Sequence, residues 1–396
     1  MSIAERLAAE IGARTPAFGK LLPIVDPEGV PGEEFLEVVR GILASKQLTN
    51  GAYVRKFEEA AAGYLGVAHC VAVSSCTAGL LLVLKVLALR GEVILPSFTF
   101  HATAHAVVWN GLTPVFADCD AKTFCVAPQA VRAHLSSRTA AILGVHLFGN
   151  PAAVKELEQI AAELQIPLVF DAAHAFGSGS HGKHVGGFGT AEVFSFSPTK
   201  LLVAGEGGLV ATRDAELAER LRTARNYGDA GNYDPEILGL NARMSEMHAA
   251  MALHGLTGLD VRIERRNEIR MRYERNLRDV AGLRFQEVAE GGRSTSKDFS
   301  VIVNEKEFRH SRDGLVELLR LENIGARKYF SPPVHRQKLY RTMWDGRALP
   351  VTDLVSDGVV NLPIYSSLTD ESVDKVCEVI RRAQGFDNAK WATGAA

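Results

Sequence analysis

The sequence SFSPTK (195–200) follows a strand-like run and places Lys200 among apolar residues, with GEGG (205–208) shortly after it. An earlier apolar run ends in FDAAH (170–174), which carries Asp171 and His174. A lysine amine can form a Schiff base with the aldehyde of pyridoxal phosphate, and a carboxylate can keep the pyridine nitrogen of this cofactor protonated. The two stretches predict a pyridoxal phosphate site if the fold brings them together.

Short β-branched runs alternate with helical patterns around these stretches. Several runs are apolar at successive positions, as in VILP (93–96) and PLVF (167–170), which is typical of strands covered on both faces. Strands separated by helices predict an α/β fold with a mostly parallel sheet of seven strands. Ligands of such sheets bind at the carboxyl ends of the strands, where Asp171 and the 195–200 segment both lie. The predicted strands are Cys70–Val73, Val93–Leu95, Pro114–Ala117, Ala140–Leu147, Pro167–Phe170, Glu192–Phe196 and Gly208–Thr212, and the predicted helices lie near 77–90, 101–110, 129–136, 151–165 and 215–225.

The composition of the chain changes near residue 257, where a long and highly charged helix is predicted to begin. We therefore predict two domains. Residues 1–256 form an N-terminal segment and a large cofactor-binding domain, and residues 257–396 form a connecting helix and a small α+β domain. In the small domain we expect strands at 299–303 and 359–362 and a last helix at about 370–384, whose acidic first turn and basic last turn suit the helix dipole.

The composition excludes several classes of function. The 44 basic and 46 acidic residues give a net charge of −2, so nothing favours nucleic acid or an anionic membrane as a partner. No apolar run reaches the roughly 18 residues of a membrane span, and the start lacks the core of a signal peptide. The five cysteines form no CxxC pair, which predicts a reduced, cytoplasmic protein. The 12 histidines show no metal-binding spacing, so we expect no metal.

Each candidate residue also has an ordinary structural interpretation. A lone lysine is most often a surface charge, although apolar neighbours would lower the pKa of Lys200 and make its amine nucleophilic. Asp171 alone could cap the next helix, and His174 alone could be a hydrogen-bonded structural residue.

A phosphate site is predicted where SSCTAGL (74–80) opens an apolar helix. One interpretation is that the serine and threonine residues there simply cap the helix. The other is a phosphate site, because the free amides and the dipole of a helix start bind phosphate. Ser195 can offer a second hydroxyl. The aromatic residues of PSFTF (96–100) are either core residues or a stacking surface for a flat heterocycle.

Taken together, these segments resemble the DegT/DnrJ/EryC1/StrS family of sugar aminotransferases over roughly residues 30–385. Many separated motifs occur in the order of the family. They are LTNG (48–51) with KFE (56–58), TA (77–78), PSFTF (96–100), Asp118, HLFG (146–149), DAAHA (171–175), SF (195–196) to Lys200, GEGG (205–208), RNYG (225–228), GLNARM (239–244) and PVH (333–335).

The resemblance implies the type I fold of pyridoxal phosphate-dependent aminotransferases, in a homodimer with shared active sites. It makes Lys200 the Schiff-base lysine and general acid/base, with Asp171 at the pyridinium. The other implied cofactor contacts are His174 near the ring oxygen, Phe100 stacked on the ring, Ser195, Thr77 and the backbone of Cys76 at the phosphate, and Asn241 reaching the phosphate from the other subunit. The chain departs from the family pattern at Cys76, where glycine is usual, at Gly79, where alanine is usual, and at Tyr227, where histidine is common.

The implied reaction moves an amino group from L-glutamate to a nucleotide-linked 3- or 4-keto-6-deoxy sugar, with pyridoxamine phosphate as the intermediate form of the cofactor. We expect substrate contacts from Arg243, Lys328, Tyr329 and His335. A keto cyclitol aminotransferase stays open as an alternative, and so does a sugar dehydratase, although such relatives have histidine in place of the lysine. Two further alternatives lie outside pyridoxal phosphate chemistry. A regulatory protein that keeps the fold would be expected to have lost Lys200 or Asp171, and both are present. An aldolase that forms a Schiff base through Lys200 without a cofactor would lack the yellow colour of bound pyridoxal phosphate.

Overall fold

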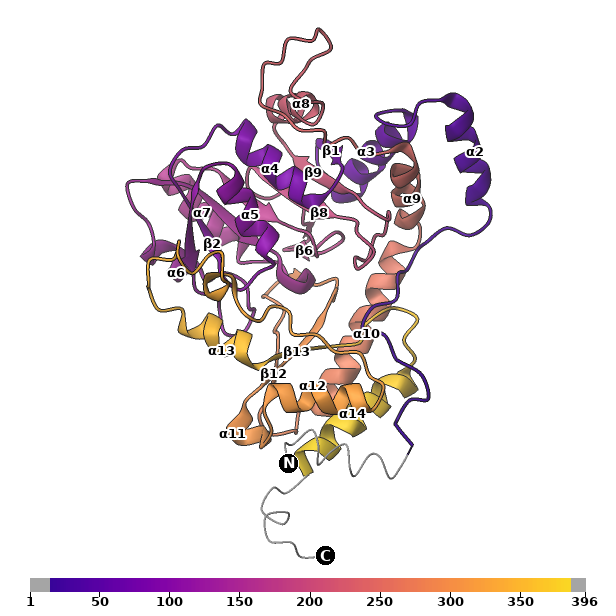
Figure 1. Ribbon diagram of the computed structural model, residues 1–396, viewed down its shortest axis with the longest axis vertical. Coiled ribbons are helices and arrows are strands. Elements are labelled where there is room, and N and C mark those ends of the chain that lie inside the picture. The colour runs from indigo at the N-terminus through magenta and orange to yellow at the C-terminus, as the bar shows by residue number, and fades with distance from the viewer. Residues whose placement is uncertain (1–14, 386–396) are drawn as a thin grey trace, which may run out of the picture.

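The computed structural model describes residues 15–385 of the 396-residue chain (Figure 1). The outer ends of the two predicted domains, 1–14 and 386–396, lie outside the described residues, and the predicted boundary at 256/257 stays a prediction. No helix within residues 15–385 is long and apolar enough to cross a bilayer.

A seven-stranded sheet forms the centre of the larger part of the molecule, as predicted. Its strand order is β1-β9-β8-β5-β4-β2-β3. Strands β8, β5, β4, β2 and β3 pair in parallel, and β9 runs antiparallel to both of its neighbours. The strands are β1 (His69–Val73), β2 (Glu92–Pro96), β3 (Thr113–Ala117), β4 (Thr139–Val145), β5 (Leu168–Asp171), β8 (Ala191–Ser195) and β9 (Gly208–Thr212).

Both faces of this sheet are covered by helices, because successive strand residues point to opposite sides and both sets are apolar. On one face, Val93 and Val193 belong to a core cluster with α4 (Cys76–Val86), α5 (His101–Trp109) and α8 (Ala215–Ala224). On the other face, Ile94 and Phe194 belong to a cluster with α3 (Ala52–Leu65), α7 (Val154–Leu164) and α9 (Glu246–Leu256). The remaining elements of this part are α2 (Phe35–Ser45), α6 (Pro128–Ala133), the 3-10 turn η1 (Leu147–Gly149), and the two-residue strands β6 (Gly179–Ser180) and β7 (Lys183–His184).

The long helix α10 (Leu259–Leu277) connects the sheet to the C-terminal half, which lies at the bottom of Figure 1. Here an antiparallel sheet, β10-β12-β13, packs with α10, α12 and α14 around a third apolar cluster. The predicted strands at 299–303 and 359–362 and the predicted last helix are confirmed. The elements are β10 (Leu283–Phe285), β11 (Gly292–Arg293), β12 (Phe299–Val303), α11 (Glu305–Phe308), α12 (Arg312–Leu321), the 3-10 turn η2 (Val334–Arg336), α13 (Pro350–Gly358), β13 (Val359–Leu362) and α14 (Asp370–Gly385).

The N-terminal segment packs onto the C-terminal half rather than onto the sheet that follows it in sequence. The amide of Leu22 donates to the carbonyl of Asn323 at 2.8 Å. Glu28 lies 3.0 Å from the guanidinium of Arg266 on α10, and both side chains are buried. Arg266 also donates to the carbonyls of Ser296 and Lys297. This ion pair therefore joins the N-terminal segment to the backbone that precedes β12.

Candidate active site

A cavity of about 670 Å³ lies at the carboxyl ends of the parallel strands, and residues from the C-terminal half close it. It brings together nine of the predicted site residues. They are Cys76, Thr77, Phe100, Asp171, His174, Ser195, Lys200, Lys328 and Tyr329. Residues that are far apart in the sequence therefore share one cavity. The pyridoxal phosphate site predicted from residues 170–174 and 195–200 depends on this proximity.

Asp171 is the last residue of β5 and lies between Val145 on β4 and Val193 on β8. Its Oδ2 accepts a hydrogen bond from the hydroxyl of Thr103 at 2.8 Å, and its Oδ1 accepts one from the amide of Ala173 at 3.1 Å. The residue is 6% exposed. These bonds fix the orientation of a buried carboxylate at the floor of the cavity, where it can face a cationic ring nitrogen.

Lys200 lies in a turn that follows β8, and its amide donates to the carbonyl of Ser197 at 3.0 Å. Leu201, Leu202 and Val203 after it are buried. Burial lowers the pKa of Lys200 to about 8, and the nearby ammonium group of Lys297 contributes in the same direction. A larger share of the amine is then uncharged near neutral pH, which is the form that attacks an aldehyde.

His174 is held in one tautomer. The amide of Phe148 donates to Nδ1 at 3.1 Å, so the proton of the neutral ring is on Nε2. Burial, with Lys200 and Lys297 nearby, places the pKa of His174 well below its usual value. The ring therefore stays neutral and can donate one hydrogen bond from Nε2 to an oxygen atom in the cavity.

The first turn of α4 provides a site for an anion. The Ser75 hydroxyl accepts from the amide of Ala78 at 3.1 Å, so the helix begins at Cys76 despite the missing family glycine. A Cβ at Gly208 would lie 2.5 Å from the carbonyl carbon of Ser75, so the start of β9 can pack directly on this turn only as glycine. The free amides of a helix start, with Thr77 and Ser195 beside the cavity, suit a phosphate group.

Two aromatic rings line the same cavity. Phe100 precedes α5, is 47% exposed, and has its ring centroid 5.9 Å from that of Phe330. Phe330 in turn stacks near His174, at 6.4 Å. An amine, a carboxylate, an anion site and flat rings within one cavity are the groups that pyridoxal phosphate requires, so the residues present fit this cofactor. The described residues contain no cluster of three or more His, Cys, Asp or Glu that could hold a metal.

Three predicted residues do not line the cavity. Asn241 is exposed and pairs with Asn226 in an isolated bridge. Arg243 donates to the side chain of Asn226 at 2.7 Å and lies over the ring of Tyr227. In the single chain neither residue lines the cavity, so their expected contacts with a cofactor or a substrate stay predictions.

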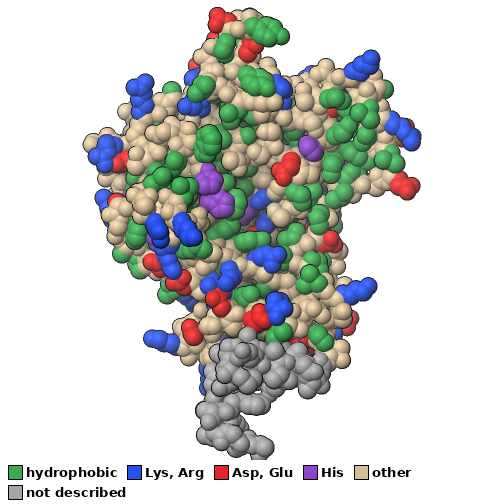
Figure 2. Space-filling view, viewed as in Figure 1, with side chains coloured by type: hydrophobic (Ala, Val, Ile, Leu, Met, Phe, Trp, Pro, Cys, Tyr) green, Lys and Arg blue, Asp and Glu red, His purple; other side chains and the backbone are tan. Residues whose placement is uncertain are grey.

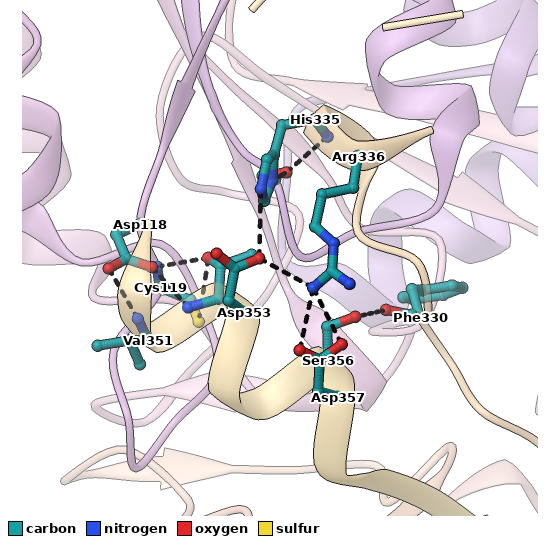
Figure 3. A network of polar contacts seen from close by, with 11 residues as sticks. Asp118, Cys119, Phe330, His335, Arg336, Val351, Asp353, Ser356 and Asp357 are labelled. Atoms are coloured by element: carbon teal, nitrogen blue, oxygen red, sulfur yellow. Dashed lines mark hydrogen bonds and ion pairs between the residues drawn. The ribbon is translucent and has the colours of Figure 1, made fainter. Parts of the chain in front are cut away.

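His335 is buried in a polar network outside the cavity (Figure 3). Its Nδ1 lies 2.7 Å from the hydroxyl of Ser97, and its Nε2 lies 3.3 Å from Asp353. The hydroxyl of Ser356, also on α13, donates to the carbonyl of Phe330 at 2.8 Å. The structure therefore gives His335 a role in holding the 329–337 segment against the sheet, and it does not bring its side chain to a substrate in the cavity.

The predicted Asp118 motif belongs to the same network. Its carboxylate accepts from the amides of Val351 and Thr352 at 3.1 and 2.7 Å, so it caps the start of α13 (Figure 3).

Sequence reasoning missed two charged residues of the cavity, Lys297 and Asp298. Both side chains are buried, and the Lys297 ammonium group lies 2.9 Å from the Asp298 carboxylate. The sequence feature that could have indicated them is a charged pair directly before the apolar run Phe299–Val303. A pair in that position usually lies on the surface, and only the packing of the C-terminal half over the sheet places it in the cavity.

Comparison with known proteins identifies the family. A family model described as the DegT/DnrJ/EryC1/StrS aminotransferase family matches residues 31–381. The chain belongs to this family. It is therefore an aminotransferase, and the family implies pyridoxal phosphate as its cofactor.

Individual relatives cover almost the whole chain. The dTDP-4-amino-4,6-dideoxy-D-glucose transaminase of Escherichia coli is 32% identical over 91% of this chain and 98% of its own length. A UDP-N-acetyl-3-dehydro-alpha-D-glucosamine 3-aminotransferase of Acidithiobacillus ferrooxidans is 34% identical, over 88% and 94%. The solved structure of DesI with its TDP-sugar product is 37% identical, covers 97% of this chain and 98% of that one, and has a TM-score of 0.90.

Proposed function

We propose that this chain transfers an amino group from L-glutamate to a keto sugar linked to a nucleotide, at the 3- or 4-keto group of a 6-deoxy sugar. The observation that carries the proposal is the placement of Lys200 and Asp171 in one cavity large enough for a cofactor and a sugar. Two of the relatives above act on nucleotide-linked amino sugars, one at C4 and one at C3, which supports the class of acceptor.

Pyridoxal phosphate supplies an electron-accepting ring and an aldehyde that can carry the amino group. The protein residues bind and orient this group. The first turn of α4, with Thr77 and Ser195, would hold the phosphate, and Asp171 would keep a proton on the pyridine nitrogen. His174 would donate a hydrogen bond from Nε2 to the ring oxygen, and Phe100 would cover one face of the ring.

Lys200 has two roles in this proposal. Its uncharged amine would hold the cofactor through the aldehyde, and when free it would act as the base that takes the proton from the α-carbon of the donor and as the acid that returns a proton. A pKa near the working pH suits both directions of this transfer, and Lys200 has such a value, about 8. The same residue would act in the reverse direction when the keto sugar is bound, which predicts ping-pong kinetics.

The active unit in this proposal is a homodimer. Leu36 and Leu43 lie seven residues apart on α2, so they share one face, and both are more than half exposed. Leu48 and Leu240 are also exposed, and Figure 2 shows apolar side chains gathered over the region of α2. Asn241 directly follows the exposed Leu240, and in the proposed dimer it would reach the phosphate site of the partner subunit.

Amino transfer can be tested directly with the purified yellow protein. L-Glutamate should yield 2-oxoglutarate, and a panel of nucleotide-linked 3-keto and 4-keto sugars and of keto cyclitols should reveal the aminated product by mass spectrometry. Lys200→Ala should lose both the covalent link to the cofactor and the transfer, whereas Lys155→Ala on the exposed side of α7 should lose neither. Amination of a cyclitol alone, or normal turnover by Lys200→Ala, would contradict the proposal.

Replacing Asp171 by Asn should retain cofactor but slow proton removal from the donor by about 100-fold or more, because the ring nitrogen would lose its anionic partner. The loss of cofactor absorbance after L-glutamate is added measures this step. An undiminished rate would remove Asp171 from the mechanism.

A further inference from the structure

The Lys297–Asp298 pair forms part of the cavity wall, and the mechanism proposed above gives neither side chain a contact with the cofactor. We propose that this pair binds hydroxyl groups of the sugar acceptor and thereby determines which keto sugar is used. The inference rests on the proposed function and adds a specificity-determining site to it.

Hydrogen bonds hold the backbone of Lys297 in place, and the two side chains of the pair bind each other. The amide of Lys297 donates to the carbonyl of Phe148 at 3.0 Å, and Arg266 donates to the carbonyl of Lys297 at 2.8 Å. Arg266 is itself fixed by Glu28. A site that is supported in this way does not have to be ordered by the ligand, which favours selective binding.

The charges of the pair favour a neutral ligand. Lys297 Nζ lies 2.9 and 3.0 Å from the two carboxylate oxygens of Asp298, so the two charges cancel locally. The phosphate and carboxylate groups of other ligands would gain little from a cation that already has an anion beside it. A hydroxyl group can accept from the ammonium and donate to the carboxylate, and both groups have hydrogen-bonding positions beyond their mutual contact.

The surroundings of the pair also suit a sugar. The Tyr329 ring centroid lies 5.8 Å from Lys297 Nζ, and Phe330 follows it in the same cavity wall. Aromatic faces beside a few fixed polar groups are typical of pockets for small ligands. Lys328, in contrast, is partly exposed and pairs with Asp313.

Stability alone does not explain the pair. Buried ion pairs are often no more stabilising than apolar residues of the same volume, because the desolvation of two charges offsets their attraction. The cost of burying this pair next to a cavity therefore points to a ligand that uses its hydrogen bonds.

The test separates the two half-reactions. The double variant Lys297→Met/Asp298→Asn removes both charges, so no unpaired buried charge is left to unfold the protein. Lys297 lowers and Asp298 raises the pKa of Lys200, so the loss of both charges removes two opposing effects. We therefore expect the half-reaction with L-glutamate, followed by cofactor absorbance, to keep the parent rate. Its affinity for the nucleotide-linked amino sugar product, measured by calorimetry, should fall about 10- to 100-fold, the effect of losing hydrogen bonds to charged groups.

Sugars that lack one ring hydroxyl give a second readout. The parent should discriminate against the analogue that lacks the hydroxyl bound by the pair, because its polar groups are then left without a partner. The double variant should lose this discrimination. Lys122→Met, which removes an exposed ion pair with Glu287 at 3.7 Å, should behave as the parent in every assay.

Three results would overturn the inference. Unchanged sugar affinity in the double variant removes the proposed role of the pair. Slowed reaction with L-glutamate together with normal sugar binding assigns the pair to the amino donor instead. A parent that accepts no amino group from any amino acid contradicts the proposed function itself, and the inference then fails with it.

Discussion

Burial removes water from around the amine of Lys200 and thereby favours its uncharged form near neutral pH. With a pKa of about 8 rather than 10.5, about one molecule in ten carries a free amine at pH 7, compared with fewer than about one in a thousand for an exposed lysine. Lys297 contributes to this lowering of the pKa through its positive charge, although it is not expected to contact the cofactor.

The rate at which cofactor-free protein forms its covalent link to pyridoxal phosphate should depend on this pKa. Because the uncharged amine is the attacking form, the rate should rise as the pH increases and level off above about pH 8. The growth of the yellow absorbance after mixing measures it. A rate that continues to rise up to pH 10 would show that burial does not lower the pKa of Lys200.

Thr103 orients the carboxylate of Asp171 through a hydrogen bond. Removing this bond should slow the reaction while the protein still binds the cofactor. Thr103→Val keeps the shape but removes the 2.8 Å hydrogen bond to the carboxylate. A hydrogen bond to a charged group contributes about 1.5–3 kcal/mol, so the half-reaction with L-glutamate should slow by roughly 10- to 100-fold. Single-turnover absorbance measures this rate, and bound cofactor per chain serves as the control.

The residues that sequence reasoning found differ in kind from those that it missed. Lys200 and Asp171 follow strong strand patterns, and the carboxyl ends of parallel strands meet at one edge, so local sequence places them. Lys297 and Asp298 reach the cavity through the packing of the C-terminal half, and the burial of His335 depends on contacts with Ser97 and Asp353. Such contacts are set by tertiary structure and leave no local pattern.

At the level of elements, all seven strands of the main sheet were predicted because their apolar runs are continuous and end in turn residues. The two-residue strands β6, β7 and β11 gave no signal, since a pattern of alternation cannot be read from two residues. Helix α4 shows how closely the elements pack. A Cβ at Gly79 would lie 2.6 Å from Val193 Cγ1 on β8, so the helix lies closer to the sheet than alanine would permit.

Gly79→Ala should therefore destabilise the protein and displace the phosphate-binding end of α4. We expect a loss of about 1–3 kcal/mol of unfolding free energy and weaker cofactor binding, measured by chemical unfolding and by equilibrium dialysis. Gly63→Ala on α3 is the matched control, because nothing lies within 4 Å of its Cβ position. Its better helix propensity should stabilise the protein by about 0.5–1 kcal/mol. Equal effects of the two substitutions would contradict the close packing of α4.

At the scale of the whole molecule, the proposed dimer depends on the exposed apolar face of α2. Leu36→Glu with Leu43→Glu places two charges on this face, so we expect a monomer in sedimentation experiments and weaker binding of the cofactor phosphate. Leu164→Glu, an exposed apolar residue at the end of α7, is the control and should leave the assembly unchanged. A dimer that persists in the double variant would place the interface elsewhere.

The attachment of the N-terminal segment to the C-terminal half has a consequence for biosynthesis. Leu22 and Glu28 leave the ribosome early, but their partners Asn323 and Arg266 are translated much later. Nascent chains tend to fold from the beginning, as each domain emerges, and this segment must wait for residues more than two hundred positions downstream. A chain truncated before residue 266 would lack both partners of the segment that carries Leu22 and Glu28.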